Sequence, residues 1–182
     1  AKVPDGTYKS EMTIDGYESP IVIQTRLEIN GDSCIVDFAG SSPQSGFGIN
    51  SPKCYTDAYT VFGLKCVIAP DTPNNHASLS CFEVKADAGS CLAPKRPAPV
   101  TARHVIGQML PDAVFGCLYQ ALPDKTPAES SGSIWVLALS GSSYDGSGPN
   151  SPSGFNVMNV GLGGVGATKN ARGLSTTAFP SG

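Results

Sequence analysis

The side chains best suited to chemistry stand close together in the stretch "RHVIGQMLPD", residues 103–112. Arg103 carries a planar cation that can hold an anion, and His104 is of the residue type that exchanges protons near neutral pH. Gln108 and Asp112 follow at intervals of four, so a helix would place them within about 80° of His104. Two interpretations stay open: a solvated polar face, or a polar stripe that lines a cleft.

A second polar group lies in the loop "PNNHAS", where Asn74, Asn75 and His76 follow one another. Asparagine tolerates left-handed backbone and bonds its own main chain, so ordinary turn chemistry is one explanation of the triplet. In the functional interpretation, the triplet faces the same cleft as His104.

The glycines of "GLGGVGATKN" match the G-x-G-x-x-G spacing of dinucleotide sites at Gly161, Gly163 and Gly166. Such a site needs a helix after the third glycine and an acidic residue about 20 positions on. No apolar stripe of helical period follows Gly166, and no acidic residue follows Asp145. We therefore reject NAD binding and expect these glycines to allow positive φ angles or close backbone approach. No P-loop motif occurs either, so we expect no cofactor on this chain.

Asp37 is a further candidate because it interrupts the apolar stretch "CIVDFAG". A carboxylate there is either hydrogen-bonded by turn amides or has a shifted pKa, and the first arrangement is the commoner one.

The cysteines are scattered beside apolar neighbours, and none forms a C-x-x-C pair. This usage favours free thiols in a reducing compartment, so we expect a cytoplasmic protein. With only two histidines, and no H-x-x-H spacing, we expect no metal site built wholly from this chain. The cysteines are Cys34, Cys54, Cys66, Cys81, Cys91 and Cys117.

Composition limits the classes of partner. The net charge is −3 with no basic cluster, which argues against nucleic acid as a partner. No apolar run reaches the roughly 18 residues of a membrane span, and no secretory leader is recognisable. At 182 residues we expect one domain over 1–182, read as a fragment of a longer polypeptide.

Alternating apolar residues predict a β-meander over residues 5–42, with a tight turn at "NGD". We expect a helix to follow, capped by Ser51 with Pro52 in its first turn. Residues 69–78 read as a loop, and residues 79–87 as a strand. The apolar stripe expected to pack this helix comprises Tyr55, Ala58, Tyr59, Phe62 and Cys66.

A longer amphipathic helix is expected over residues 102–122, kinked or split by Pro111. Strands are expected over 133–141, 154–161 and 174–179. The predicted fold class is therefore α+β, a loop-rich domain with a mixed or antiparallel sheet and two main helices packed on it.

Several stretches together resemble the hydantoinase B family, notably "VDFAGSSPQSGFGINSPKCYTDAYTVFGLKC" and "RPAPVTARHVIGQMLPDAVFGCLYQALPDKTPAE". That family includes the B-type subunits of N-methylhydantoin hydrolysing enzymes, the C-terminal part of 5-oxoprolinase and a large subunit of acetone carboxylases. The resemblance implies the central portion of a hydrolase subunit that acts on a small cyclic amide. An A-type partner would bind ATP in such a hetero-oligomer. A divalent metal, where one is needed, would come from the upstream segment absent here.

The resemblance also implies roles for particular residues. Arg103 would hold an anion or oxyanion, and His104 would carry a proton. The amides of Asn50, Asn75 and Gln108 would contact the substrate. Two alternatives stay open: a scaffold portion without catalytic residues, and an ATP-dependent ketone carboxylase.

In two places the chain departs from its relatives. "NNHAS" carries His76 and Ala77 where relatives usually read Ala-Gly, which reshapes either the pocket or only its rim. "ATKNARGLS" lacks the Pro-Gly-x-Asp-Gly type of turn expected there, and with it an acidic residue, so we place no site residue in that segment.

Overall fold

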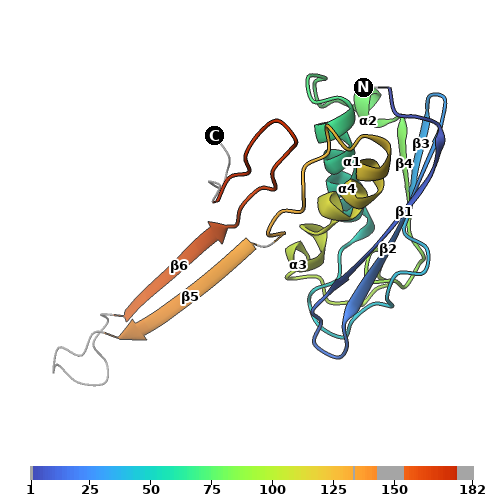
Figure 1. Cartoon of the computed structure of the whole chain (residues 1–182). Helices are drawn as coiled ribbons and strands as arrows, with labels where there is room; N and C mark the ends of the chain where they lie inside the picture. Colours follow the sequence, from blue (N-terminus) through green and yellow to red (C-terminus); the bar gives the residue numbers. More distant parts are fainter. Residues whose placement is uncertain (1, 133, 143–153, 176–182) are drawn as a thin grey trace.

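A computed structural model describes residues 2–132, 134–142 and 154–175 (Figure 1). Most of the strand expected over 174–179 therefore lies outside the described residues. The described elements are β1 (Gly6–Ile14), β2 (Ile21–Asn30), β3 (Ser33–Asp37), α1 (Lys53–Ile68), α2 (His76–Leu79), β4 (Phe82–Lys85), α3 (His104–Gly107), α4 (Leu110–Ala121), β5 (Ile134–Ser142) and β6 (Gly154–Leu162).

The main sheet has the strand order β1–β2–β3–β4. Its first three strands are the predicted antiparallel meander, and β4 adds in parallel to β3. The turn between β2 and β3 uses Gly31 at a φ of 58°, a conformation that glycine adopts without steric cost. The sheet is thus mixed, and the α+β prediction is confirmed.

The core lies between one face of this sheet and the two longest helices, α1 and α4 (Figure 1). Alternate residues of β2 point inward, so Ile23 and Leu27 are fully buried while Arg26 between them is exposed. Phe38 and Leu118 are fully buried in the same cluster. Each such side chain contributes about 1.5–3 kcal/mol through burial.

The start of α1 differs from its prediction. The helix begins at Lys53, Pro52 occupies the N-cap position, and no side chain caps it. Ser51 is instead buried, and its hydroxyl accepts a hydrogen bond of 2.9 Å from the Thr56 hydroxyl.

The buried face of α1 is also not the predicted one. Ala58, Phe62 and Cys66 are exposed, with Phe62 at 57%. The reason is the close approach of α4: a Cβ on Gly63 would lie 2.8 Å from the Cα of Pro111. Small residues therefore line the contact between the helices, and the aromatic side chains lie beside it or outside it. The side chains buried along α1 include Thr56, Thr60, Leu64 and Val67.

Pro111 splits the second helical segment, as predicted. The short α3 ends at Gly107, and α4 starts anew at Leu110 with Pro111 in its first turn. Proline is tolerated there because the first turn of a helix needs no donor from its backbone nitrogen.

The segment predicted as a loop over 69–78 contains the start of α2. Asn75 caps this single turn by accepting a 2.9 Å hydrogen bond from the Ser78 amide. The buried Lys65 ties the preceding loop to α1, since its ammonium donates to the Thr72 carbonyl and the Asn74 side chain. A capped turn thus replaces part of the expected loop.

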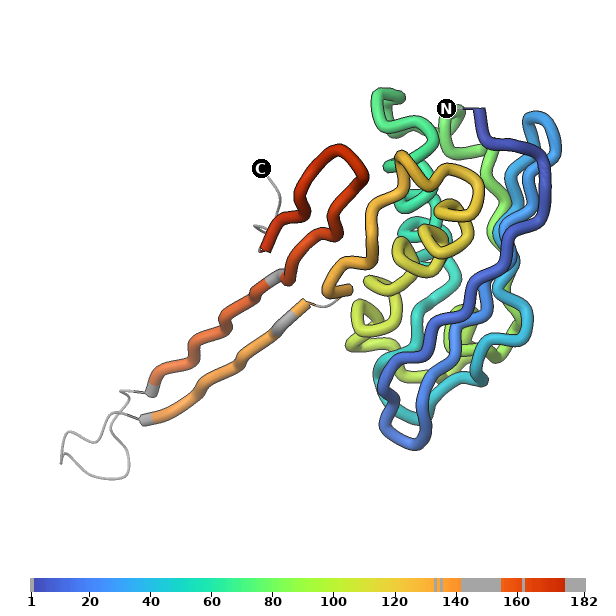
Figure 2. Tube along the Cα trace, in the orientation of Figure 1, coloured from blue at the N-terminus to red at the C-terminus, as the bar shows by residue number. Residues whose placement is uncertain are grey.

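The strands β5 and β6 form a separate antiparallel hairpin that projects from the body (Figure 1). Residues 163–175 then fold back beside the segment before β5 (Figure 2). The Ala128 amide donates to the Ala167 carbonyl at 2.8 Å. A Cβ on Gly166 would lie 1.8 Å from the Ala128 carbonyl oxygen, so glycine serves close backbone approach here. Within the described residues 167–175, no helix follows Gly166.

Candidate functional site

The candidate site lies where the segment before α3 meets the first turn of α1. Arg103 is exposed, and its guanidinium carbon lies 5.6 Å from the centroid of the Tyr55 ring. A cation at this distance over an aromatic face is attracted by the ring quadrupole. The contact holds the Arg103 side chain against the body while its charge remains in reach of solvent.

Tyr55 is itself held firmly. Its ring stacks on Tyr59 with centroids 4.4 Å apart, and it lies so close to Gly107 that a Cβ there would be 2.1 Å from a ring carbon. Burial raises the pKa of Tyr55 to about 12, and hydrogen bonding with Tyr59 acts in the same direction against a weaker effect of Gln108. The hydroxyl therefore stays protonated at neutral pH and is a neutral hydrogen-bond donor.

Gln108 and His104 are both half-buried in this neighbourhood. Gln108 is the C-cap residue of α3 and hydrogen-bonds with Tyr55 through its side chain. His104 is the first residue of α3 and follows Arg103 directly. The structure thus brings two of the predicted residues, Arg103 and Gln108, to Tyr55.

Asp112 is not part of this cluster, and this corrects the expected stripe. The Asp112 carboxylate is 4% exposed and accepts hydrogen bonds from the Ser130 amide at 3.2 Å and the Ser130 hydroxyl at 2.6 Å. The separate start of α4 at Leu110, after α3 has ended at Gly107, breaks the four-residue register with His104. Neither a continuous solvated face nor a continuous polar stripe results.

Asn50 is fully buried, and the structure gives its amide a supporting position. Its oxygen accepts from the Ser45 amide at 2.8 Å, and its nitrogen donates to the carbonyls of Ser45, Phe47 and Pro99. The loop at 45–50 is thereby fixed to the residues just before Arg103. Because Asn50 has no exposed polar atom, the structure does not support the expected direct contact between Asn50 and a substrate.

Asn75 and His76 lie at the other end of α1, contrary to the shared cleft of the functional interpretation. The Tyr55 end of that helix carries the Arg103 contact, whereas Lys65 near its end holds the loop before Asn75. Lys65 lies ten positions after Tyr55 in α1, which is about 15 Å along the helix axis. In Figure 1, α2 and α3 accordingly lie at opposite ends of α1.

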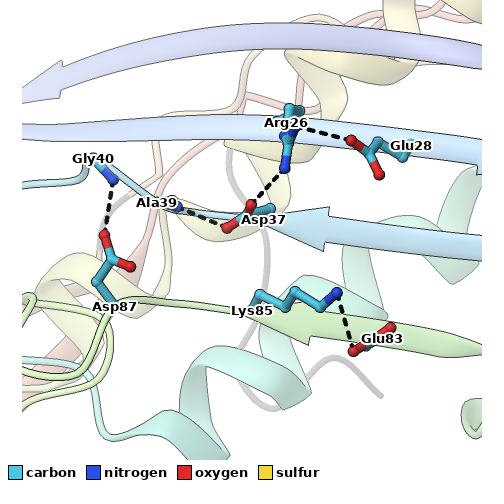
Figure 3. Close-up of polar contacts among 8 residues, drawn as sticks. All are labelled: Arg26, Glu28, Asp37, Ala39, Gly40, Glu83, Lys85 and Asp87. Carbon is cyan, nitrogen blue, oxygen red and sulfur yellow. Dashed lines mark hydrogen bonds and ion pairs between the residues drawn. The ribbon is translucent and has the colours of Figure 1, made fainter.

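Asp37 belongs to a polar network on the uncovered face of the main sheet (Figure 3). Partial burial acts to raise the pKa of Asp37, but hydrogen bonds from the Ala39 amide at 2.9 Å and the Arg26 guanidinium at 2.8 Å outweigh it. The pKa therefore lies below its usual range, and the carboxylate is the hydrogen-bonded kind that the sequence favours. Arg26 also pairs with Glu28 at 3.0 Å.

An apolar groove of about 510 Å³ lies between α1, α2 and β4, away from the Arg103 cluster. Each charged side chain that lines it already has a partner: Asp57 pairs with Lys53, Glu83 with Lys85, and Lys65 binds the loop carbonyls. The groove therefore presents an apolar surface that includes Phe62, while its charged side chains are already paired within the chain.

Within the described part of the chain, no group of three or more His, Cys, Asp or Glu residues could hold a metal ion. All six cysteines carry free thiols. Burial raises the pKa of Cys34 to about 12 and of Cys91 and Cys117 to about 11, so these thiols stay protonated. Among the described residues, no helix combines the length and apolar character needed to cross a bilayer.

The fold and the sequence together define a known family. A match to the family described as Hydantoinase B/oxoprolinase runs over residues 1–182, so the chain belongs to that family. The chain is 30% identical over 158 residues to a putative B-type D-/L-hydantoinase subunit from Pseudomonas sp. (strain NS671). That match covers 79% of this chain and 26% of that protein.

Two solved structures share the fold. The ATP-dependent caprolactamase from Pseudomonas jessenii matches with a TM-score of 0.79 and 23% identity, over 98% of this chain and 31% of that one. The nucleotide-free structure of acetone carboxylase matches with a TM-score of 0.75 and 16% identity, over 97% of this chain and 25% of that one. The chain spans only 23% and 26% of the length of the first two curated relatives that it matches.

Sequence reasoning missed the tyrosine pair as part of the site. Tyr55 and Tyr59 fit the apolar stripe of an amphipathic helix, which is how such spacing is ordinarily interpreted. The available signal was "HVIGQ", since a glycine one position before Gln108 leaves room for a large ring from a neighbouring element.

Proposed function

We propose that this chain is part of a hydantoinase B-type subunit that hydrolyses a small cyclic amide together with an ATP-binding A-type partner. N-methylhydantoin, 5-oxoproline and similar lactams define the substrate class. The observation that carries the proposal is the family match over the whole chain, supported by a relative named as a hydantoinase subunit and a structural neighbour named as a caprolactamase.

The Arg103 cluster supplies chemistry suited to such a reaction. ATP-dependent opening of a lactam passes through oxygen-centred negative charge, whether as a phosphorylated intermediate or as an oxyanion. An exposed guanidinium binds such oxygens through paired N–H groups. In the proposal, Arg103 binds this charge, the neutral Tyr55 hydroxyl and Gln108 provide polar contacts, and His104 carries a proton.

Asn50 and Asn75 take different places in the proposal. Asn50 positions the segment before Arg103 through its bonds to the Ser45 and Pro99 backbones. Asn75 remains a substrate contact only if the substrate extends along α1, because its side chain caps α2. ATP, and any divalent metal, would be bound by other parts of the enzyme.

The test is ATP-dependent lactam hydrolysis by the complete enzyme with substitutions in this cluster. Arg103→Ala should lower kcat/KM by about 100-fold or more, the size expected when a donor to developing oxyanion charge is lost. Arg172→Ala is the matched control, since Arg172 is exposed in the segment after β6. It should leave kcat/KM within about twofold, as surface substitutions ordinarily do.

The alternatives predict other outcomes. If this portion is only a scaffold, Arg103→Ala and His104→Ala leave turnover unchanged while the enzyme still assembles. The structural likeness to acetone carboxylase favours ketone carboxylation as the second candidate. That activity requires bicarbonate, so product formed from a ketone only with bicarbonate, and none from lactams, would replace hydrolysis. The 182-residue chain alone is expected to be inactive in either case.

A further inference from the structure

Two aromatic side chains outside the Arg103 cluster stack on each other at the surface of the body. Tyr17, in the turn between β1 and β2, is 70% exposed, and Phe47 is 48% exposed. Their ring centroids lie 4.6 Å apart, with an angle of 23° between the ring planes. Single exposed apolar side chains are ordinary, whereas exposed aromatic groups in contact with each other mark binding surfaces. The pair is therefore a candidate binding surface.

The loop that carries Phe47 is tied to the turn that carries Tyr17. The Glu18 carboxylate accepts hydrogen bonds from the Ser45 hydroxyl at 2.8 Å and from the Gly46 amide at 2.9 Å. The bond from the Ser45 hydroxyl lowers the pKa of Glu18, so the carboxylate is charged at neutral pH. The Ser45 hydroxyl also accepts from the Phe47 amide at 3.0 Å. Both rings are thus positioned before a ligand arrives, which lowers the entropic cost of binding.

The same loop lies against the segment that leads into Arg103. The Ala102 amide donates to the Gly48 carbonyl at 2.8 Å, and these two residues are the chain neighbours of Arg103 and Phe47. Standard backbone dimensions therefore limit the distance between the Cα atoms of Phe47 and Arg103 to about 14 Å. In Figure 1, the turn between β1 and β2 accordingly lies at the same end of the body as α3. One small molecule can span this interval.

We propose that Tyr17 and Phe47 are specificity-determining residues of the Arg103 site and stack on an aryl ring carried by the cyclic amide substrate. This assignment deepens the proposed function and rests on it. Arg103 binds the oxygen-centred charge at the reacting amide, and the aryl ring lies against the open face of the stacked pair. Aromatic rings attract one another when offset, with centroids about 4.5–7 Å apart, so a third ring continues the stack.

The size of the surface favours a small ring over a protein partner. Within the described turn at 15–20 and the loop at 43–48, the only large apolar side chains are those of Tyr17 and Phe47. Two rings match the area of one aryl group. A stable protein interface, in contrast, buries about 800 Å² on each partner around its aromatic anchors.

Two lactams test the assignment in the complete enzyme with ATP. The wild type should show a kcat/KM about tenfold or more higher for 4-phenyl-2-pyrrolidinone than for 2-pyrrolidinone, the size of effect that an apolar contact gives. Tyr17→Ala should remove this preference, chiefly through KM, and leave kcat/KM for 2-pyrrolidinone within about twofold. Tyr17→Phe should keep the preference, because the ring alone stacks. A wild type without the preference, or an equal loss for both lactams, would overturn the assignment.

Phe62→Ala is the matched control. Phe62 is 57% exposed and lies in the groove away from the Arg103 cluster, so kcat/KM for both lactams should stay within about twofold. Tyr17 and Phe47 lie outside the hydrophobic core, so thermal unfolding of the variants should be unchanged. If Tyr17→Ala weakens assembly of the enzyme and slows both lactams alike, the pair belongs to a protein interface and the assignment is wrong.

Binding without ATP separates this assignment from the proposed hydrolysis. By calorimetry, the Kd of the complete enzyme for 4-phenyl-2-pyrrolidinone should rise about tenfold or more in Tyr17→Ala and less than about twofold in Phe62→Ala. If this change in Kd occurs while neither lactam is hydrolysed, the proposed function fails and the aryl contact stands. If the wild type does not bind the phenyl lactam, or binds it with the same Kd as Tyr17→Ala, the aryl contact is refuted. A loss of turnover in Arg103→Ala would then still support the proposed function.

Discussion

The two sheets of this protein solve the same problem differently. The main sheet buries Ile23 and Leu27 under α1 and α4 and turns Arg26 and Glu28 outward. The β5–β6 hairpin carries apolar side chains outward on both sides. The comparison teaches that the pattern of apolar and polar residues along a strand does not by itself tell how many faces are covered. In β2 one face is buried under the helices, whereas the described residues cover neither face of the hairpin.

The largest effect on the free energy of unfolding should come from the core beneath the main sheet. Phe38→Ala should lower the free energy of unfolding by about 3–5 kcal/mol, because Phe38 is fully buried and the substitution leaves a cavity. Phe155→Ala in the hairpin should cost less than about 1 kcal/mol, since its side chain is half exposed. Urea titrations of both variants measure the difference. Similar losses would show that the body and the hairpin form one packed unit.

A smaller effect is expected where the two regions join. Gly166→Ala places a methyl group 1.8 Å from the Ala128 carbonyl oxygen, so the segments must separate at a cost of about 1–3 kcal/mol. Gly48→Ala is the control, because its Cβ would meet neighbours at 3.6 Å, an ordinary contact. Thermal unfolding compares them. Equal melting temperatures would mean that the segments do not cross as closely as described.

The smallest effect concerns the outer face of the main sheet. The pKa of Asp37 is depressed, so its stabilisation is complete above the unfolded value near 3.9 and is lost as pH falls through the folded value. Asp37→Asn should therefore cost about 1 kcal/mol at pH 7, and the gap to the wild type should close below about pH 4.

Unfolding free energies at pH 7 and pH 3 check this prediction, with the exposed Asp71→Asn as the control. A gap of the same size at both pH values would show that the Asp37 carboxylate contributes nothing through its charge.

The sheet was predictable because its information is local. Apolar residues alternate from Ile21 to Ile29, and "NGD" has the glycine that the turn requires. Pro111 likewise announces the end of one helix and the start of another. These features depend on backbone preference and on neighbours within a few residues of each other.

The packing of α1 was not predictable in the same way. Its aromatic residues suggest the buried side, yet the helix packs along Thr56, Thr60 and Gly63. The choice depends on Pro111 and Val114, which lie far along the chain and require a small partner. The residue types along α1 alone do not reveal which distant segment will pack against the helix.

The site shows the same limit. Arg103 and Gln108 could be selected by type and spacing, but their tyrosine partner comes from another helix. Asp112 shares their spacing and lies elsewhere, because α4 starts after a break and turns its carboxylate toward Ser130. Periodicity predicts neighbours only while one helix continues unbroken.

The bond between Asp112 and Ser130 fixes the root of the hairpin to the first turn of α4. The Ser130 hydroxyl is further bonded to the Gly132 amide, two residues before β5 begins. Because α4 approaches α1 closely at Gly63, and α1 carries Tyr55, the base of the hairpin and the arginine cluster are anchored to the same pair of helices.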